Sequence, residues 1–156
     1  MVDESLGPPF SLTVSGVGFS IPESVLHDSA SDIYLVANIN GAAAEKDGNG
    51  FISRVSPQGV VTDLKWIDGG SSGVTLNGPK GMTIVADTLF VTDIDCIRRF
   101  QRETGAPLRD LCLEEGAFLN DLTSTSRGDL YFSDSGTEDS PGAVYFLRQL
   151  AEVPQV

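Results

Sequence analysis

Three copies of one short pattern restrict what this chain can fold into. Each copy is an apolar run that ends in a small residue followed by Asn or Asp, and the copies lie at residues 34–38, 88–93 and 129–134. Their closing residues, Asn38, Asp93 and Asp134, are separated by 55 and then 41 residues, and the longer interval contains an additional Gly-, Ala- and Asn-rich stretch at 40–50. A repeat of about 40 to 45 residues is typical of a β-propeller blade.

The segments around these copies also indicate strands. A matched piece precedes each copy, at residues 22–26, 79–84 and 119–122, and helical periodicity is nearly absent. Runs rich in β-branched and aromatic residues, bounded by Gly, Pro, Asn and Asp, predict strands. These runs cover residues 32–39, 51–55, 60–66, 88–91 and 143–147. The ordered repeat favours a propeller, and a β-sandwich whose strands resemble one another by accident is the alternative.

We therefore predict an all-β fold: a partial β-propeller of about three four-stranded blades in one domain, residues 1–156. The blades are expected at about 19–67, 76–113 and 117–147, with 1–18 as an N-terminal extension or a strand of the closing blade. In the second blade, 96–102 and 108–113 are the expected outer strands. Because propellers close with roughly four to eight blades, three leave two open faces, so a homodimer or a missing second half is expected.

The charge narrows the classes of partner. The chain has 22 acidic and 10 basic residues and a formal net charge of -12. A field of that sign opposes binding to nucleic acid and to anionic membranes and attracts cations, and the alternative is that the charge serves solubility alone. No apolar run is long enough to span a membrane and no signal peptide is visible. We expect a soluble protein, cytoplasmic, or periplasmic or secreted if a signal was removed.

Cysteine and histidine offer little catalytic chemistry. Cys96 and Cys112 match no zinc or redox spacing, so a disulfide and two buried thiols both stay open. His27 is the single histidine, which does not suggest a catalytic triad; we expect it to stack on a neighbouring blade. Residues 47–50, Asp-Gly-Asn-Gly, resemble part of a calcium loop but lack its other ligands, and predict a tight turn.

Several motifs, in this order, resemble the SMP-30/gluconolactonase/LRE-like family and related NHL-type propellers. The resemblance extends from about Phe19 to Leu147 and would correspond to the first half of a six-bladed member. The motifs are PESVLHD at 22–28, IYLVANI at 33–39, KDGNGFIS at 46–53, LKWI at 64–67, PKGM at 79–82 and VTDID at 91–95.

The resemblance implies a divalent metal, calcium or zinc, on the propeller axis and, in hydrolytic members, opening of sugar lactones. By motif, Glu23 matches the glutamate of the first blade and Asn120 an asparagine of the third, and the adjacent Asp121 is also an oxygen ligand of the right type. Lys80 stands at the axial position of the second blade and is no ligand at neutral pH. The family's other ligands belong to blades outside this chain, so one copy does not complete the site.

The predicted function is metal-dependent hydrolysis of a lactone or ester in a completed ring, with a lactone or sugar-like small molecule as partner; catalytic residues stay unassigned. The alternative is a non-catalytic propeller that binds a ligand or a protein. The alternative roles are a turn residue after Pro22 for Glu23 and the capping of a turn for Asn120 and Asp121. The repetition of Asp93 and Asp134 at the ends of inner strands predicts a structural role, in which their carboxylates accept hydrogen bonds from backbone N–H groups of the next turn.

Overall fold

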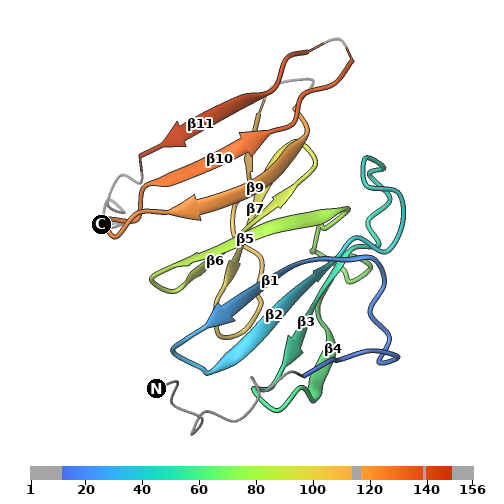
Figure 1. Ribbon diagram of the computed structural model, residues 1–156. Coiled ribbons are helices and arrows are strands. Elements are labelled where there is room, and N and C mark those ends of the chain that lie inside the picture. Colours follow the sequence, from blue (N-terminus) through green and yellow to red (C-terminus); the bar gives the residue numbers. More distant parts are fainter. Residues whose placement is uncertain (1–11, 114–116, 139, 149–156) are drawn as a thin grey trace, which may run out of the picture.

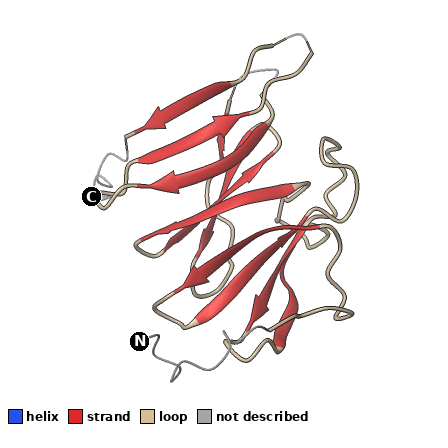
Figure 2. Ribbon diagram, in the orientation of Figure 1, coloured by secondary structure: helices blue, strands red, loops and turns tan. Residues whose placement is uncertain are grey.

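The computed structural model describes residues 12–113, 117–138 and 140–148. In that part of the chain every helix-or-strand element is a strand (Figure 2). The strands form three antiparallel sheets, each with its strands in sequence order. The first sheet contains β1 (Pro22–Asp28), β2 (Ile33–Asn38), β3 (Phe51–Val55) and β4 (Val61–Asp68). The second contains β5 (Pro79–Val85), β6 (Thr88–Asp93), β7 (Cys96–Gln101) and β8 (Leu111–Cys112). The third contains β9 (Leu119–Ser124), β10 (Leu130–Asp134) and β11 (Ala143–Leu147).

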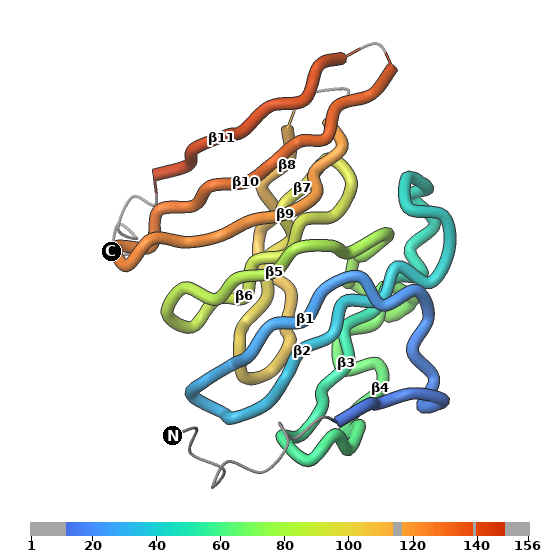
Figure 3. Tube along the Cα trace, in the orientation of Figure 1, coloured from blue at the N-terminus to red at the C-terminus, as the bar shows by residue number. Residues whose placement is uncertain are grey.

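The sheets lie one after another as the blades of a propeller. β5, the first strand of the second sheet, contacts β1 on one side and β9 on the other. In Figure 1, β9, β5 and β1 follow one another down the view, and the Cα trace in Figure 3 shows each sheet leading away from this inner row. The prediction of an all-β partial propeller is confirmed. Residues 12–18 precede β1 without forming a strand, and 1–11 lie outside the described residues.

Two apolar clusters hold neighbouring blades together. Leu35 and Ala37 of β2 pack with Met82, Leu89 and Val91 of the second blade. On the other side of that blade, Phe90 and Ile97 pack with Leu122, Leu130 and Phe132 of the third. Successive residues of a strand point to opposite faces, so Leu89 and Phe90 serve different interfaces. This explains why the three successive residues Leu89, Phe90 and Val91 are all apolar.

The repeated Asn or Asp at the end of the second strand ties each blade to its own beginning. Asn38 Oδ1 accepts a hydrogen bond from Ser20 N, Asp93 Oδ1 from Gly78 N, and Asp134 Oδ1 from Phe118 N. These donors all precede the inner strand. The expected hydrogen bond from the next turn is observed at Asp134, which also accepts from Gly136 N. Asp93 instead accepts hydrogen bonds from backbone N–H groups of residues that precede it in the chain. The architectural role predicted for these residues is thus observed.

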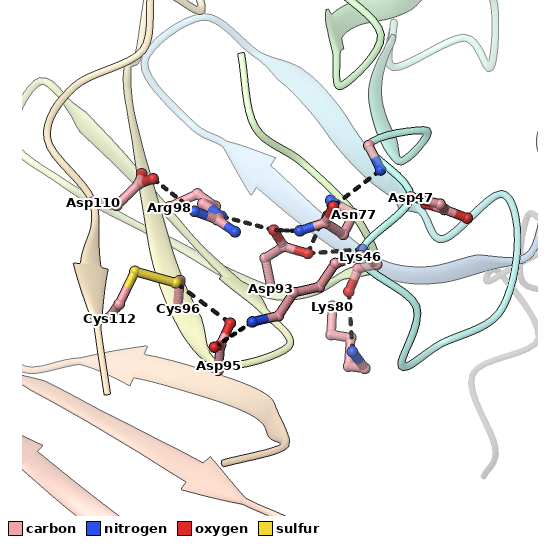
Figure 4. A network of polar contacts seen from close by, with 12 residues as sticks. Lys46, Asp47, Asn77, Lys80, Asp93, Asp95, Cys96, Arg98, Asp110 and Cys112 are labelled. Carbon is pink, nitrogen blue, oxygen red and sulfur yellow. Dashed lines mark hydrogen bonds and ion pairs between the residues drawn. A yellow bond between two sulfur atoms is a disulfide. The ribbon is translucent and has the colours of Figure 1, made fainter. Parts of the chain in front are cut away.

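Asp93 carries a larger polar network than its counterparts (Figure 4). It is fully buried and also accepts from Asn77 Nδ2 and from Arg98 Nε, the latter at 2.7 Å. Arg98 Nη1 donates to Asp110 Oδ2, also at 2.7 Å. Burial by itself would lower the pKa of Arg98, but its hydrogen bonds and charge interactions with Asp93 and Asp110 prevail and raise it. A buried charge needs such partners.

Two sequence predictions require revision in this part of the molecule. The outer strand expected at 108–113 is only β8, two residues long, because the pairing with β7 shifts by one residue between the isolated bridge Phe100–Pro107 and the pair Ile97–Leu111, which interrupts the ladder. His27 does not stack on a neighbouring blade: its ring stacks on Tyr34 of its own sheet, with ring centroids 4.8 Å apart, since no other blade among the described residues packs on that face.

The cysteines, left open by the sequence, are joined. Cys96 of β7 and Cys112 of β8 are directly paired across the two strands and form a disulfide. No helix long and apolar enough for a membrane crossing is found among the described residues.

Gly81 permits the close approach of the second and third blades. A Cβ at this position would lie 2.7 Å from Asp121 Cα and 2.8 Å from Leu122 N, which are backbone atoms of β9. We expect Gly81→Ala to lower the free energy of unfolding by about 1–3 kcal/mol, because the strands must move apart. Urea denaturation measures this, with Gly70→Ala as the comparison, because a Cβ at that position would meet only the Asp68 carboxylate, at 3.4 Å. Equal losses in both variants would contradict the role assigned to Gly81.

Candidate functional site

The three inner strands present equivalent positions toward the axis. Pro22 pairs with Asn38, Pro79 with Asp93 and Leu119 with Asp134, so the next residues, Glu23, Lys80 and Asn120, correspond. In each blade the register then shifts by one residue. Such β-bulges redirect side chains and are frequent beside functional sites. The bulges therefore explain how a regular sheet aims Glu23 and Asn120 at one region.

A hollow of about 200 Å³ lies between the inner strands at this level. Its lining combines the three predicted site residues with two small residues that leave space between them. The lining residues are Glu23, Ser24, Gly81, Asn120 and Asp121. The structure thus brings Glu23, Asn120 and Asp121 together, although almost 100 residues separate the first from the other two. None of the three lies in a turn, because Glu23 belongs to β1 and the others to β9.

Hydrogen bonds orient the polar groups from the third blade. Asn120 Nδ2 donates to Ser135 Oγ at 3.1 Å, which leaves the amide oxygen Oδ1 as the acceptor for a ligand. Asp121 Oδ1 accepts from Leu122 N at 2.8 Å, and Asp121 N donates to Ser133 Oγ. Asp121 therefore retains one carboxylate oxygen that makes no hydrogen bond to described residues.

The environment of the hollow disfavours the ionised form of Glu23. Desolvation raises the pKa of Glu23, and the negative charge of Asp121 raises it further, while the positive charge of Lys80 acts in the opposite direction. The Glu23 side chain still has much of its surface in water. A cation placed between the two carboxylates would relieve both effects, since it favours the ionised form of each.

Lys80, at the equivalent position of the second blade, is buried, with 3% of its surface exposed. Its Nζ donates to Gly78 O at 3.0 Å and Ala43 O at 3.2 Å and lies 4.5 Å from the ring centroid of Phe118. Burial lowers its pKa, and the charges of Asp93 and Glu23 oppose that change. Lys80 directs its proton donors at backbone carbonyls and is not part of the hollow's lining, which agrees with its exclusion as a ligand.

The long connection between β2 and β3 closes over the second blade near Lys80. Besides the contact from Ala43, Lys46 Nζ forms an ion pair with Asp95 Oδ2 at 2.6 Å, and Gly48 N donates to Asn77 Oδ1 (Figure 4). Asp47 accepts from Asn49 N, as in the predicted tight turn. Sequence reasoning identified this stretch only as an insertion. The contacts of this stretch could not be predicted from the sequence, because they join residues that are 29 to 49 positions apart.

The donor set of the hollow is incomplete for a metal ion. Among the described residues no group of three or more His, Cys, Asp or Glu side chains could hold one. Glu23 and Asp121 supply carboxylates and Asn120 an amide oxygen, all hard ligands, and calcium takes six to eight oxygens. The residues present thus fit part of a calcium site and, lacking nitrogen or sulfur ligands, do not fit the usual zinc site.

Comparison with known proteins supports the fold. No protein-family model matches the chain, and no curated protein matches it either. Among solved structures, the chain is similar to selenomethionine-substituted virginiamycin B lyase from Staphylococcus aureus, with a TM-score of 0.53 and 20% identity. The similarity covers 85% of this chain and 43% of that one, so this chain spans less than half of its length. At this identity the comparison shows the β-propeller fold alone, and the resemblance to the SMP-30/gluconolactonase/LRE-like family stays a prediction.

Proposed function

We propose that the hollow is the first half of an axial calcium site, and that the completed ring hydrolyses a lactone or similar ester of a small sugar-like molecule. The observation that carries this proposal is the convergence of Glu23, Asn120 and Asp121 on one hollow from two different blades. Oxygen ligands of this kind select a hard cation. The chemistry that such a cation supplies is polarisation of an ester carbonyl and acidification of a water molecule.

The residues of the chain have separate parts in this proposal. Glu23 and Asp121 attract the cation, Asn120 contributes a neutral oxygen, and Gly81 and Ser24 leave room between the strands. Lys80 lies close enough to stabilise the ionised form of Glu23 but adds a positive charge that opposes a second cation. Further ligands must come from other blades, so the affinity of this chain by itself is expected to be low.

A non-catalytic propeller that binds a ligand or a protein is the second candidate. The buried ammonium group of Lys80 favours it, because one of the three axial positions already holds a fixed positive charge. The two candidates differ in calcium response and in turnover: an enzyme of the proposed type needs both, and a binding module needs neither.

Calcium is expected to raise the thermal unfolding temperature of the protein. Binding to the folded state stabilises it by about 2.7 kcal/mol when calcium exceeds its Kd a hundredfold. Glu23→Gln and Asp121→Asn should each remove most of this shift, whereas Glu45→Gln, in the exposed β2–β3 connection, should retain it. Scanning fluorimetry with calcium and with zinc measures the shifts. Absence of a shift with every divalent ion, together with no lactone hydrolysis, would eliminate the enzymatic candidate.

Without metal, Glu23→Gln is expected to stabilise the chain slightly at neutral pH. The pKa of Glu23 is raised above its ordinary value of 4.5, so the folded state binds a proton more readily than the unfolded state, and ionisation opposes folding. The gain is at most about 1 kcal/mol because the side chain is largely solvated. It should disappear as the pH falls below 4.5, where the glutamate is protonated in both states. Urea denaturation across this range measures it, and a destabilised variant at neutral pH would contradict the raised pKa of Glu23.

A further inference from the structure

Two sheet faces have no neighbouring blade among the described residues, and both are apolar. On the first blade, Val25 is 66% exposed, beside Tyr34. On the third blade, Val144 is 74% and Phe146 48% exposed, and Phe146 lies against Tyr131 with ring centroids 4.8 Å apart. Exposed apolar patches of this kind mark interaction sites. We call these the first-blade face and the third-blade face.

The residues of the first-blade face are equivalent to residues that pack against the preceding blade in the second and third blades. Val25 lies three residues after the start of its inner strand, as Met82 and Leu122 do in the other two blades. Tyr34 lies four residues before the end of its second strand, as Leu89 and Leu130 do. Met82 and Leu89 are buried against the first blade, and Leu122 and Leu130 against the second. The sequence therefore keeps apolar residues on the first blade where the other blades bury them.

The third-blade face has the opposite set of positions. Tyr131 corresponds to Phe90, and Val144 to Ile97, because each is paired in the same way within its sheet. Phe90 and Ile97 are the residues that the second blade inserts against the third. The two free faces are thus the two halves of the blade-to-blade interface that this chain already forms twice.

A hydroxyl group also bridges adjacent blades at the axial end of each existing interface. Ser24 Oγ of the first blade donates to Lys80 O of the second at 2.5 Å, and Thr92 Oγ1 of the second donates to Asn120 O of the third at 2.6 Å. Ser133 occupies in the third blade the position that Thr92 occupies in the second. The carbonyl of Glu23 occupies in the first blade the position that the accepting carbonyl of Lys80 occupies in the second. The third blade thus has the donor, and the first blade the acceptor, for one more bond of this type.

A hollow on the first-blade face has space for the incoming aromatic residues. It measures about 620 Å³, and its lining includes Val25, Tyr34, Val36 and Val55 together with Leu12, Val14 and Phe19 of the segment before β1. In the existing interface between the second and third blades, Phe90 is 1% exposed. Tyrosine at the centre of an apolar contact is a frequent source of binding energy.

We propose that the third-blade face of this chain docks on the first-blade face of a second copy, and reciprocally, so that two copies close a ring of six blades. In each contact Tyr131 enters the 620 Å³ hollow, and Ser133 Oγ donates to the carbonyl of the partner's Glu23. The inference concerns assembly and does not rest on the proposed calcium site. Both copies carry a net charge of -12, so their association strengthens as salt screens the repulsion.

Sedimentation equilibrium of the chain should give a mass twice its 16.5 kDa, with a dimer that tightens as salt is added. Val25→Asp and Val144→Asp each place a charge on one face and should each produce monomers. Both positions are highly exposed in the single chain, so circular dichroism should show an unchanged fold. Val60→Asp, 60% exposed in the turn between β3 and β4 and outside the lining of the first-blade hollow, is the control and should stay dimeric.

Mixing the two monomeric variants tests which face meets which. A pair composed of one Val25→Asp chain and one Val144→Asp chain has one contact that is unaltered on both sides, so the mixture should regain dimers that neither variant forms alone. A strict monomer under all conditions would overturn the proposal. Open-ended polymers would overturn the closed ring, and a dimer that Val144→Asp leaves intact would show that the first-blade faces pair with each other instead.

Discussion

Replacing Asp93 by alanine is expected to lower the free energy of unfolding by about 3–5 kcal/mol, the largest effect of any single substitution considered for this chain. The carboxylate is fully buried, pairs with Arg98 Nε at 2.7 Å, and accepts hydrogen bonds from Asn77 N and Gly78 N. Its removal leaves a buried guanidinium short of a partner and backbone N–H groups unsatisfied. Chemical denaturation followed by circular dichroism measures the loss.

Two further variants separate the charge from the backbone bonds. Asp134→Ala removes the corresponding carboxylate of the third blade, which caps Phe118 N and Gly136 N without an arginine, and should cost only about 1–3 kcal/mol. Asp93→Ala combined with Arg98→Met removes both charges and should be less damaging than Asp93→Ala alone. Equal losses for Asp93→Ala and Asp134→Ala would show that the ion pair contributes nothing.

Loss of the disulfide between Cys96 and Cys112 is expected to cost about 3 kcal/mol, because the bond closes a loop with a sequence separation of 16 and so restricts the unfolded chain. The structural consequence concerns β8, which is two residues long and pairs only with β7. The measurement is the denaturation midpoint of Cys96→Ala/Cys112→Ala against the oxidised parent.

Reduction provides the matched control for this prediction. A reducing agent should lower the stability of the parent to about that of the double variant and should leave the double variant unchanged. The nearby Arg98–Asp110 ion pair lies on the same two segments and should weaken with the loss of the bond. A parent chain that is equally stable in both redox states would show that the cysteines do not contribute as a bridge.

Much of the fold was predictable because the blade repeat is local. The runs at 33–38, 51–55, 88–93 and 143–147 alternate or fill both faces as strands do, and Gly and Asn mark their turns, so sheet type and strand order follow from short-range rules. The outer strand before Cys112 was predicted too long, since pairing around Pro107 depends on the geometry of β7 and not on propensity.

The candidate site was predictable in part. Glu23 and Asn120 were selected because their motifs resemble those of the SMP-30/gluconolactonase/LRE-like family, and Asp121 because it adds an oxygen ligand beside Asn120. The bulges that aim them, the backbone contacts of Lys80, and the closure of the β2–β3 connection over the second blade could not be read, because each depends on residues distant in sequence. The ring of His27 was assigned to a neighbouring blade, whereas its partner is Tyr34, which lies directly opposite it in the β1–β2 hairpin.

The amino-acid sequence alone determined the period of the repeat, the strand-rich character of the chain and the acidic charge, because these depend on residue type and on spacing within about 50 positions. Only the tertiary structure decided that the cysteines are bonded, that Asp93 and Arg98 neutralise each other in the interior, and that the two free faces carry opposite halves of one interface. Pairing of this kind is a property of distance in space, and many chain conformations with the same local pattern would place those atoms elsewhere.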